Sequence, residues 1–338
     1  MKPTAVDLLA CPVCRHSLRL QGEGQSGEEI LVGSLQCSSC HREYVVRDGI
    51  PRFVSDQEES GHVAQSFGFE WQTFHEGGFE PDTVFGRRID EDVAQFYEVF
   101  GGSAQLDGAR ILDAGCGSGK LTAELAARHP TATVVGVDIN PAIAEVYAAS
   151  RRLPNLHIVH GSIFELPFPN GSFGIVWCNG VIHHTGNTRG AFDGLTRVVR
   201  AGGQLFVWVY QRKFSPLVAL RMVLLPLGLT RWRHEFLYRL CQAISVPTWL
   251  AVQVLRVVNG TKVAQRHTHA RILTRKRGYR ELTLTWFDVL SPKFRDTYTE
   301  DELRSWFRDS NFDNLRAYWW PVGITGTRRS DHPRPTSR

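Results

Sequence analysis

A glycine-rich segment at residues 113–119 carries the clearest chemistry in the sequence. It runs Asp-Ala-Gly-Cys-Gly-Ser-Gly and lies between an apolar run and a stretch with helical periodicity. Glycines let a backbone turn sharply and approach a ligand closely, because they have no Cβ. Asp138 ends the next apolar run, where a carboxylate can accept hydrogen bonds from the ribose hydroxyls of a nucleoside. The segment therefore predicts a nucleoside-binding loop.

Three kinds of ligand compete for this loop. The dinucleotide-binding pattern has its third glycine one residue later, where Lys120 stands. The P-loop pattern requires a glycine in place of Ala114 and Ser or Thr in place of Leu121. S-adenosylmethionine remains, and its ammonium group would explain the carboxylate of Asp113 at the start of the loop. A plain tight turn in an α/β protein is the alternative without a ligand.

Around this loop, apolar strand-like runs alternate with helical periodicity. The expected strands cover residues 110–114, 133–138, 156–160, 174–178 and 204–210, and the expected helices cover residues 120–129, 141–152 and 188–200. This alternation predicts an α/β fold, in which helices cover both faces of a parallel sheet. Near the C-terminus, Thr299 and Glu302 form a capping-box pattern at the start of a helix that ends near residue 310. A further strand is expected at residues 314–320.

Four successive segments resemble the motifs of class I S-adenosylmethionine-dependent methyltransferases. They are residues 113–119, 135–138, 166–173 and 195–205. The resemblance covers about residues 67–325 and implies a Rossmann-like, seven-stranded methyltransferase sheet. The cofactor-binding residues that it implies are Asp113, Gly115, Cys116, Gly117, Gly119, Asp138, Ile139, Ser162, Ile163, Cys178 and Asn179.

The same resemblance implies a role for each group. The glycine loop would face the methionine part, Asp138 the ribose, and Ser162 and Ile163 the adenine, while Cys178 and Asn179 would line the floor. Ser162 stands where the family often has an acidic residue that receives the adenine amino group. That contact is then weaker, or is made by the backbone of Ile163.

A second departure from the family pattern lies beside the fourth expected strand. The residue after Phe173 is commonly Asp in the family, but it is Gly174 here. The strand should persist, because residues 175–177 still form a buried apolar run.

Two CxxC pairs near the N-terminus, Cys11 with Cys14 and Cys37 with Cys40, have zinc-ribbon spacing. Four thiolates close a tetrahedral zinc site, so its role would be structural, and the metal would supply folding energy to a small unit. A redox dithiol or thiols without metal are the alternatives. Residues 9–14 and 44–51 also resemble the zinc-ribbon family of methyltransferase-activator proteins. Modules of that family bind or activate methyltransferases.

Catalytic candidates should follow the ends of the strands, where open α/β sheets bind ligands. His183, His184 and Tyr210 stand at such positions. Methyl transfer requires an aligned nucleophile and, for a hydroxyl or amine, removal of its proton, which a histidine can accept at neutral pH. The alternative is that the histidine pair shapes the loop beneath the substrate. Weaker candidates are His75 and Glu76.

Two further segments are expected to cover the site. Aromatic residues 67–71 would form a lid over the cofactor cleft or pack in the core, and residues 211–280 would form a helical cap. The apolar stretches of the cap, residues 217–229 and 235–258, suit a hydrophobic substrate, a second copy in a homodimer, or a membrane surface. The basic segment 262–280 suits a phosphate or an RNA backbone, or is a solvated face. Residues 288–292 and Tyr298 are candidate substrate contacts.

Composition narrows the class of protein but not its partner. The chain has 338 residues, 22% charged residues and a net charge of +5, which is ordinary for a soluble globular protein. The first ten residues are too short and too polar for a signal peptide, and no long uninterrupted apolar run follows, so we expect a cytoplasmic protein. The predicted division is a zinc ribbon at 1–54, a linker and aromatic lid at 55–100, a methyltransferase domain at 101–325 and a disordered tail at 326–338.

The function predicted first is methylation of a small molecule, a glycoconjugate or a lipid-linked biosynthetic intermediate. Methyltransferases joined to such a ribbon resemble enzymes of surface-sugar, natural-product or lipid-linked biosynthesis. An RNA methyltransferase is the first alternative, although the residues after the fourth strand, 178–181, lack an Asn-Pro-Pro-Tyr-like motif. The second is a non-catalytic, cofactor-binding scaffold that acts through its ribbon.

Overall fold

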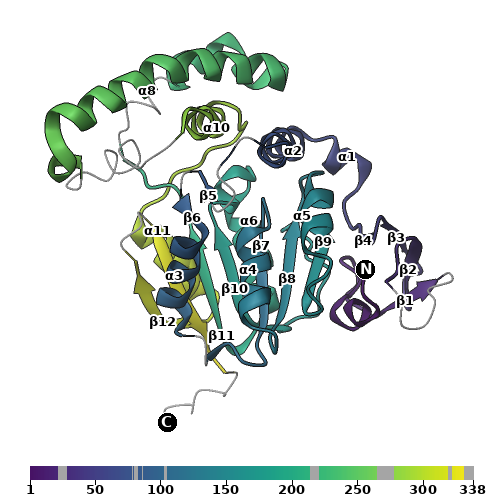
Figure 1. Ribbon diagram of the computed structural model, residues 1–338. Helices are drawn as coiled ribbons and strands as arrows, with labels where there is room; N and C mark the ends of the chain where they lie inside the picture. The colour runs from purple at the N-terminus through teal and green to yellow at the C-terminus, as the bar shows by residue number, and fades with distance from the viewer. Residues whose placement is uncertain are drawn as a thin grey trace.

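The computed structural model describes residues 1–21, 29–77, 79, 83–85, 87–102, 105–213, 221–264, 278–318 and 322–330. Residues 265–277, which form most of the predicted basic segment, lie outside these ranges. Figure 1 shows a central sheet with helices on both faces, a small β unit beside one edge and a layer of helices across one end.

The central sheet has seven strands in the order β12-β13-β11-β10-β7-β8-β9. Strands β7 to β11 are parallel, and β13 is antiparallel to both β11 and β12. This confirms the predicted seven-stranded, Rossmann-like α/β fold. The bounds are β7 (Arg110–Ala114), β8 (Thr133–Asp138), β9 (Leu156–His160), β10 (Phe173–Asn179), β11 (Val199–Trp208), β12 (Phe312–Ala317) and β13 (Gly323–Arg328).

Two hydrophobic cores lie on the two faces of this sheet. One contains Leu112, Val135 and Val176 of the strands and packs against α6 (Thr188–Val198) and α11 (Glu300–Asp309). The other contains Ile111, Val134 and Ile175 and packs against α3 (Ile89–Phe100), α4 (Lys120–Arg128) and α5 (Ile143–Ser150). Because successive side chains of a strand point to opposite faces, consecutive apolar residues such as Ile111 and Leu112 serve both cores. The capping box of Thr299 and Glu302 begins α11 as predicted.

The structure corrects three predicted boundaries. Strand β13 continues to Arg328, so the tail predicted from residue 326 begins too early. This strand contains two glycines and little apolar sequence, and its backbone bonds to β11 and β12 define it instead. Strand β11 begins at Val199, before the expected 204. The linker predicted from residue 55 contains the short helix α1 (Asp56–Glu59), followed by α2 (His62–His75).

The N-terminal unit docks on the edge of the main sheet. After η1 (Pro3–Leu8), it forms a four-stranded sheet of β1 (Leu18–Gln21), β2 (Gly33–Cys37), β3 (Glu43–Arg47) and β4 (Ile50–Pro51). The Phe53 amide donates to the His160 carbonyl of β9 over 2.8 Å, and the Ala10 amide donates to Pro167 over 2.9 Å. The unit therefore lies against β9 (Figure 1), and its apolar residues join the first core.

Helices α2, α8 (His234–Ala264) and α10 (Tyr279–Leu290) cross the ends of the parallel strands (Figure 1). The short η4 (Leu225–Leu227) and η5 (Leu229–Arg231) precede α8, and β5 (Thr83–Val84) and β6 (Arg87–Arg88) pair beside this layer. A third core, which includes Cys241 and Phe287, holds the helices together. Across the described ranges, no helix has both the length and the apolar character that a membrane span requires.

Candidate functional site

The glycine loop after β7 is tied to the end of β8 by backbone hydrogen bonds. The Gly115 and Cys116 amides donate to the Val137 carbonyl over 2.8 and 3.1 Å. The Gly117 amide donates to Oδ2 of Asp138 over 2.8 Å. Gly117 and Gly119 have φ values of 54° and 69°, a region that favours glycine. The structure therefore brings the predicted glycine loop and Asp138 together.

Helix α2 packs directly on this loop. A Cβ at Gly117 would lie 2.7 Å from the Trp71 ring, and a Cβ at Gly68 would lie 2.7 Å from Pro141, which follows β8. Both glycines thus allow a close approach that a larger residue would prevent. The predicted aromatic lid therefore contacts both cofactor loops through α2.

Asp113 occupies the end of β7 beneath the loop. Its carboxylate is buried and accepts a hydrogen bond of 2.6 Å from the Thr122 hydroxyl. Burial raises the pKa of Asp113 to about 7, against the effect of the Thr122 bond, and the charge of Asp138 acts in the same direction as burial. A cationic ligand group would favour the ionised carboxylate.

The other predicted cofactor residues lie at the ends of β8, β9 and β10. The Gly161 amide donates to the Asp138 carbonyl over 3.0 Å, which places the loop of Ser162 and Ile163 beside β8. The Ile139 carbonyl lies 2.9 Å from Nε2 of His160. Cys178 is buried within β10, and Asn179 is exposed at its end. No contact in the structure tests their assignment to ribose, adenine or floor, which stays a prediction.

Asn140 was missed by the sequence analysis. Its side chain is fully buried, yet neither amide atom has a hydrogen-bond partner among the described residues. Buried amide groups normally have partners, so this one fits a polar ligand beside Asp138. The only sequence signal was a polar residue two places after the end of a strand.

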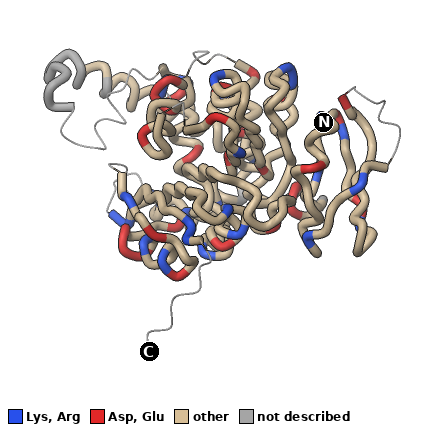
Figure 2. Tube along the Cα trace, turned by 90° about the horizontal axis from the view of Figure 1, so that it is seen from below, with Lys and Arg blue, Asp and Glu red and all other residues tan. Residues whose placement is uncertain are grey.

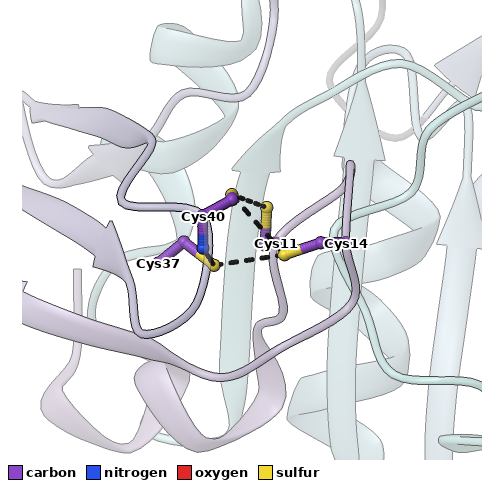
Figure 3. A group of neighbouring side chains, drawn as sticks. All are labelled: Cys11, Cys14, Cys37 and Cys40. Atoms are coloured by element: carbon purple, nitrogen blue, oxygen red, sulfur yellow. Dashed lines mark hydrogen bonds between the residues drawn. The ribbon is translucent and has the colours of Figure 1, made fainter.

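The four predicted zinc ligands converge in the N-terminal unit (Figure 3). All four Sγ atoms of Cys11, Cys14, Cys37 and Cys40 lie within 4.8 Å of one another. The Cys14–Cys37 and Cys11–Cys40 sulfur separations are 3.3 and 3.7 Å. Tetrahedral zinc with bonds of about 2.3 Å separates its sulfurs by about 3.8 Å. The thiolate set therefore fits a structural zinc ion.

The two knuckles of this site have matching backbones. Arg15 and His41 each follow the second cysteine of a pair, and both have positive φ values, of 66° and 59°. The amides of Ser39 and Cys40 point to Cys37 Sγ over 3.4 and 3.5 Å. The backbone thus turns around the position of the metal at both pairs.

The three catalytic candidates lie together at the ends of β10 and β11. His183 and His184 belong to η3 (Ile182–His184), and the ring centroids of His183 and Tyr210 are 4.0 Å apart. Nδ1 of His184 lies 2.9 Å from the Phe294 carbonyl. His183 is fully buried, and neither of its ring nitrogens has a hydrogen-bond partner among the described residues. Burial lowers the pKa of both histidines, so His183 is a neutral imidazole.

Tyr210 is held on two sides. Its hydroxyl donates to Asp288 of α10 over 3.1 Å, and the Arg295 guanidinium stacks 3.8 Å from its ring centroid. Burial raises the pKa of Tyr210. The structure therefore joins Asp288, a predicted substrate contact, to the catalytic candidates. The Tyr298 backbone N–H donates to the Tyr210 carbonyl over 2.8 Å. The ring of Tyr298 packs on Trp306.

The structure adds Glu70 to this cluster and leaves the weaker candidates outside it. Glu70 is fully buried on α2 between Phe69 and Trp71. Glu70 shares a helix face with Ser66 and Phe74. This four-residue spacing was the sequence signal that could have predicted its burial. The ring of His75 packs on Phe74 at the end of α2, and Glu76 is exposed.

Comparison with known proteins matches two segments of the chain to family models. Residues 112–207 match a model described as a methyltransferase domain, and residues 2–49 match one described as a Trm112p-like protein. The chain is 38% identical over 101 residues to trans-aconitate 2-methyltransferase of Deinococcus radiodurans, which covers 30% of this chain and 38% of the relative. It is 36% identical over 100 residues to malonyl-[acyl-carrier protein] O-methyltransferase of Legionella pneumophila, which covers 28% and 34%.

These matches span little more than a third of the length of the curated relatives. Among solved structures, magnesium protoporphyrin IX methyltransferase of Synechocystis, with bound S-adenosylhomocysteine, has a TM-score of 0.43 and 15% identity, and covers 78% of this chain and 95% of its own.

The fold, the glycine loop and the matched segment define a class I S-adenosylmethionine-dependent methyltransferase domain. In this chain the domain is preceded by a Trm112p-like zinc ribbon, which docks on the edge of its sheet.

Proposed function

We propose that the whole chain is an S-adenosylmethionine-dependent methyltransferase that acts on a small molecule or a glycoconjugate or lipid-linked intermediate. One observation carries the proposal. The glycine loop and Asp138 lie at the same end of the sheet as the cluster formed by the buried His183 with Tyr210 and Asp288. A donor site and an acceptor site are thus adjacent along the ends of the parallel strands.

Different residues of the chain have different roles in the proposed reaction. When bound, the donor supplies a methyl group on a sulfonium centre. His183 is neutral and its ring nitrogens have no partner among the described residues, so in this proposal it accepts a proton from the acceptor. Asp288 and Arg295 hold Tyr210 against His183. Helix α2 covers the glycine loop and excludes water from the donor.

The ribbon has a supporting role in this proposal. A zinc ion bound by the four cysteines would hold its two knuckles together. The hydrogen bond from Phe53 to His160 supports β9 one residue before the loop predicted to meet adenine. We also propose the division into ribbon, lid, methyltransferase domain and helical cap. The free cysteines fit a reducing compartment such as the cytoplasm.

A small acceptor is favoured over RNA. Figure 2 shows Lys and Arg interspersed with Asp and Glu along the described chain, whereas RNA binding favours a basic track on one face. The homodimer and membrane contacts predicted for the cap stay predictions. Val246, Leu250 and Val254 are exposed along α8 and support an apolar contact there.

Labelled methyl donor tests the proposed function. We expect the purified full chain to transfer label to the small-molecule fraction of a bacterial extract and to form S-adenosylhomocysteine. Total RNA is the parallel substrate. Label found only in RNA would favour the alternative function. Binding of S-adenosylhomocysteine without transfer to either fraction would favour the non-catalytic scaffold.

Cofactor binding should depend on pH through Asp113. Below its pKa of about 7 the carboxyl is protonated, so binding of an ammonium group requires proton release. The affinity for S-adenosylhomocysteine should therefore fall by about tenfold for each pH unit below 7. Calorimetry between pH 5.5 and 8.5 measures this. The slope should vanish in Asp113→Asn and with 5′-methylthioadenosine, which lacks the amino-acid end. An equal slope with both ligands would contradict the assignment.

A further inference from the structure

A pair of carboxyl groups faces inward where α2 meets α10. Glu70 lies on α2 and Asp288 on α10, and Asp288 raises the pKa of Glu70 after the larger effect of burial. Neither residue belongs to the cofactor loops. Cofactor binding therefore does not explain why these two carboxyl groups lie at this interface.

The packing of α2 on α10 places the two carboxyl groups at one helix interface. The Ser66 hydroxyl donates to the Ser291 hydroxyl over 2.8 Å, and the rings of Phe69 and Phe287 are 5.2 Å apart. Ser66 lies one turn before Glu70, and Ser291 lies one turn after Asp288, so each serine shares a helix face with a carboxyl group. The same interface thus brings Glu70 toward Asp288 and Tyr210.

This cluster has unused hydrogen-bonding groups. Glu70 is fully buried, and both of its carboxyl oxygens lack partners among the described residues. Partners among the described residues are also lacking for both ring nitrogens of His183, Nε1 of Trp208 and Nε of Arg295. Buried polar groups are costly without partners. So many in one cluster point to a polar ligand that completes them.

The charges of the cluster select the kind of ligand. Burial and Asp288 keep Glu70 protonated, and burial keeps His183 neutral. Arg295 lies over Tyr210, whose hydroxyl bonds to Asp288, and Arg221 is engaged by the carbonyls of Val289, Leu290 and Pro292. A carboxylate acceptor would lie beside the Asp288 carboxylate, which forms no ion pair within the described residues, and the two negative charges would repel each other. A neutral substrate could accept a hydrogen bond from the protonated Glu70 carboxyl and donate one to a ring nitrogen of His183.

We propose that Glu70, Asp288 and His183 form the acceptor subsite, and that the acceptor is a neutral molecule methylated on a hydroxyl group. This inference rests on the proposed methyltransferase function. Glu70 holds a neighbouring oxygen of the acceptor through its carboxyl proton, and the reacting hydroxyl faces His183. The hydroxyl oxygen gains the methyl carbon, the carbon–sulfur bond breaks with its electron pair on sulfur, and the proton moves to His183.

Two substitutions at one position test the subsite. The probes are methyl glycosides and phenols as neutral acceptors, trans-aconitate as a carboxylate, and simple primary amines. We expect turnover with the neutral panel only. Glu70→Ala should lower kcat/KM by about 100-fold, as expected for loss of a buried hydrogen bond that orients the acceptor. Glu70→Gln, which keeps a neutral donor, should recover activity to within about tenfold of the wild type.

The controls separate this inference from the proposed function. The exposed Glu76→Ala on the same helix is the matched control. S-adenosylhomocysteine affinity should stay within about twofold of the wild type in both Glu70 variants. Turnover of trans-aconitate or amines alone, or equal losses in Glu70→Gln and Glu70→Ala, would overturn the inference and leave the methyltransferase standing. Failure of the wild type to bind S-adenosylhomocysteine would overturn both.

A stability measurement decides the state of Glu70 without any acceptor. The groups that face it are Asp288 from α10, Cys241 from α8 and Tyr210 after β11. The unfolded chain ionises Glu70 near the usual pKa of 4.5 while the folded chain keeps it protonated, so the wild type loses stability as pH rises. The melting temperature of Glu70→Gln should therefore rise relative to wild type from pH 5.5 to pH 8.5. A constant difference would overturn the inference.

Discussion

Asp138→Ala should weaken binding of S-adenosylhomocysteine by about 100-fold or more. The carboxylate accepts hydrogen bonds from the backbone N–H groups of Gly117, over 2.8 Å, and Asn140, over 3.0 Å. Each hydrogen bond to a charged group contributes about 1.5–3 kcal/mol. The substitution removes both bonds, together with the predicted ribose contact. Isothermal titration calorimetry measures the loss directly.

A second variant separates binding from folding in this experiment. Asp313→Ala removes a half-exposed carboxylate that pairs with Arg329 at the far strand β12 and should leave the affinity unchanged. Asp138→Ala should still melt cooperatively, because the buried cores on both faces of the sheet remain. Affinity within a few-fold of the wild type in a folded Asp138→Ala protein would refute the assigned cofactor site.

Loss of the metal should cause the largest decrease in stability. Cys37→Ser removes a fully buried ligand of the four-sulfur site. Structural zinc supplies about 10–16 kcal/mol of apparent binding free energy in small zinc domains. We expect the wild type to contain one zinc ion per chain by elemental analysis, and Cys37→Ser to contain none. The ribbon should then unfold, as circular dichroism and limited proteolysis would show.

The effect should extend to the methyltransferase domain. The ribbon and the main sheet share one core, and Phe53 bonds to His160 of β9. The melting temperature of the whole chain should therefore fall in Cys37→Ser and after treatment with a strong chelator. Cys241→Ala, at a free buried cysteine outside the cluster, should retain its zinc. A chelated protein with an unchanged melting temperature would show that the site does not hold a structural metal.

Local patterns predicted most of the elements correctly. Strands β7, β8 and β9 have the predicted bounds, because each is a short apolar run that is buried on both faces. The predicted strand around Gly174 is present, and the ladder to β11 shifts register between Phe173 and Ile175. Strand β13 was not predicted. Its Gly326 is required because a Cβ there would lie 2.7 Å from Leu315 and 2.8 Å from Phe307, a constraint from packing partners distant in the chain.

The cofactor loop and the zinc ligands are determined by the sequence alone, because their groups lie within short, contiguous motifs whose spacing follows from backbone geometry. The cluster around Tyr210 is a product of tertiary structure. Glu70, Tyr210 and Asp288 come from three separate parts of the chain, and only the packing of α2 on α10 above the strand ends brings them together. Such long-range convergence leaves no local periodicity, whereas a glycine loop or a cysteine pair does.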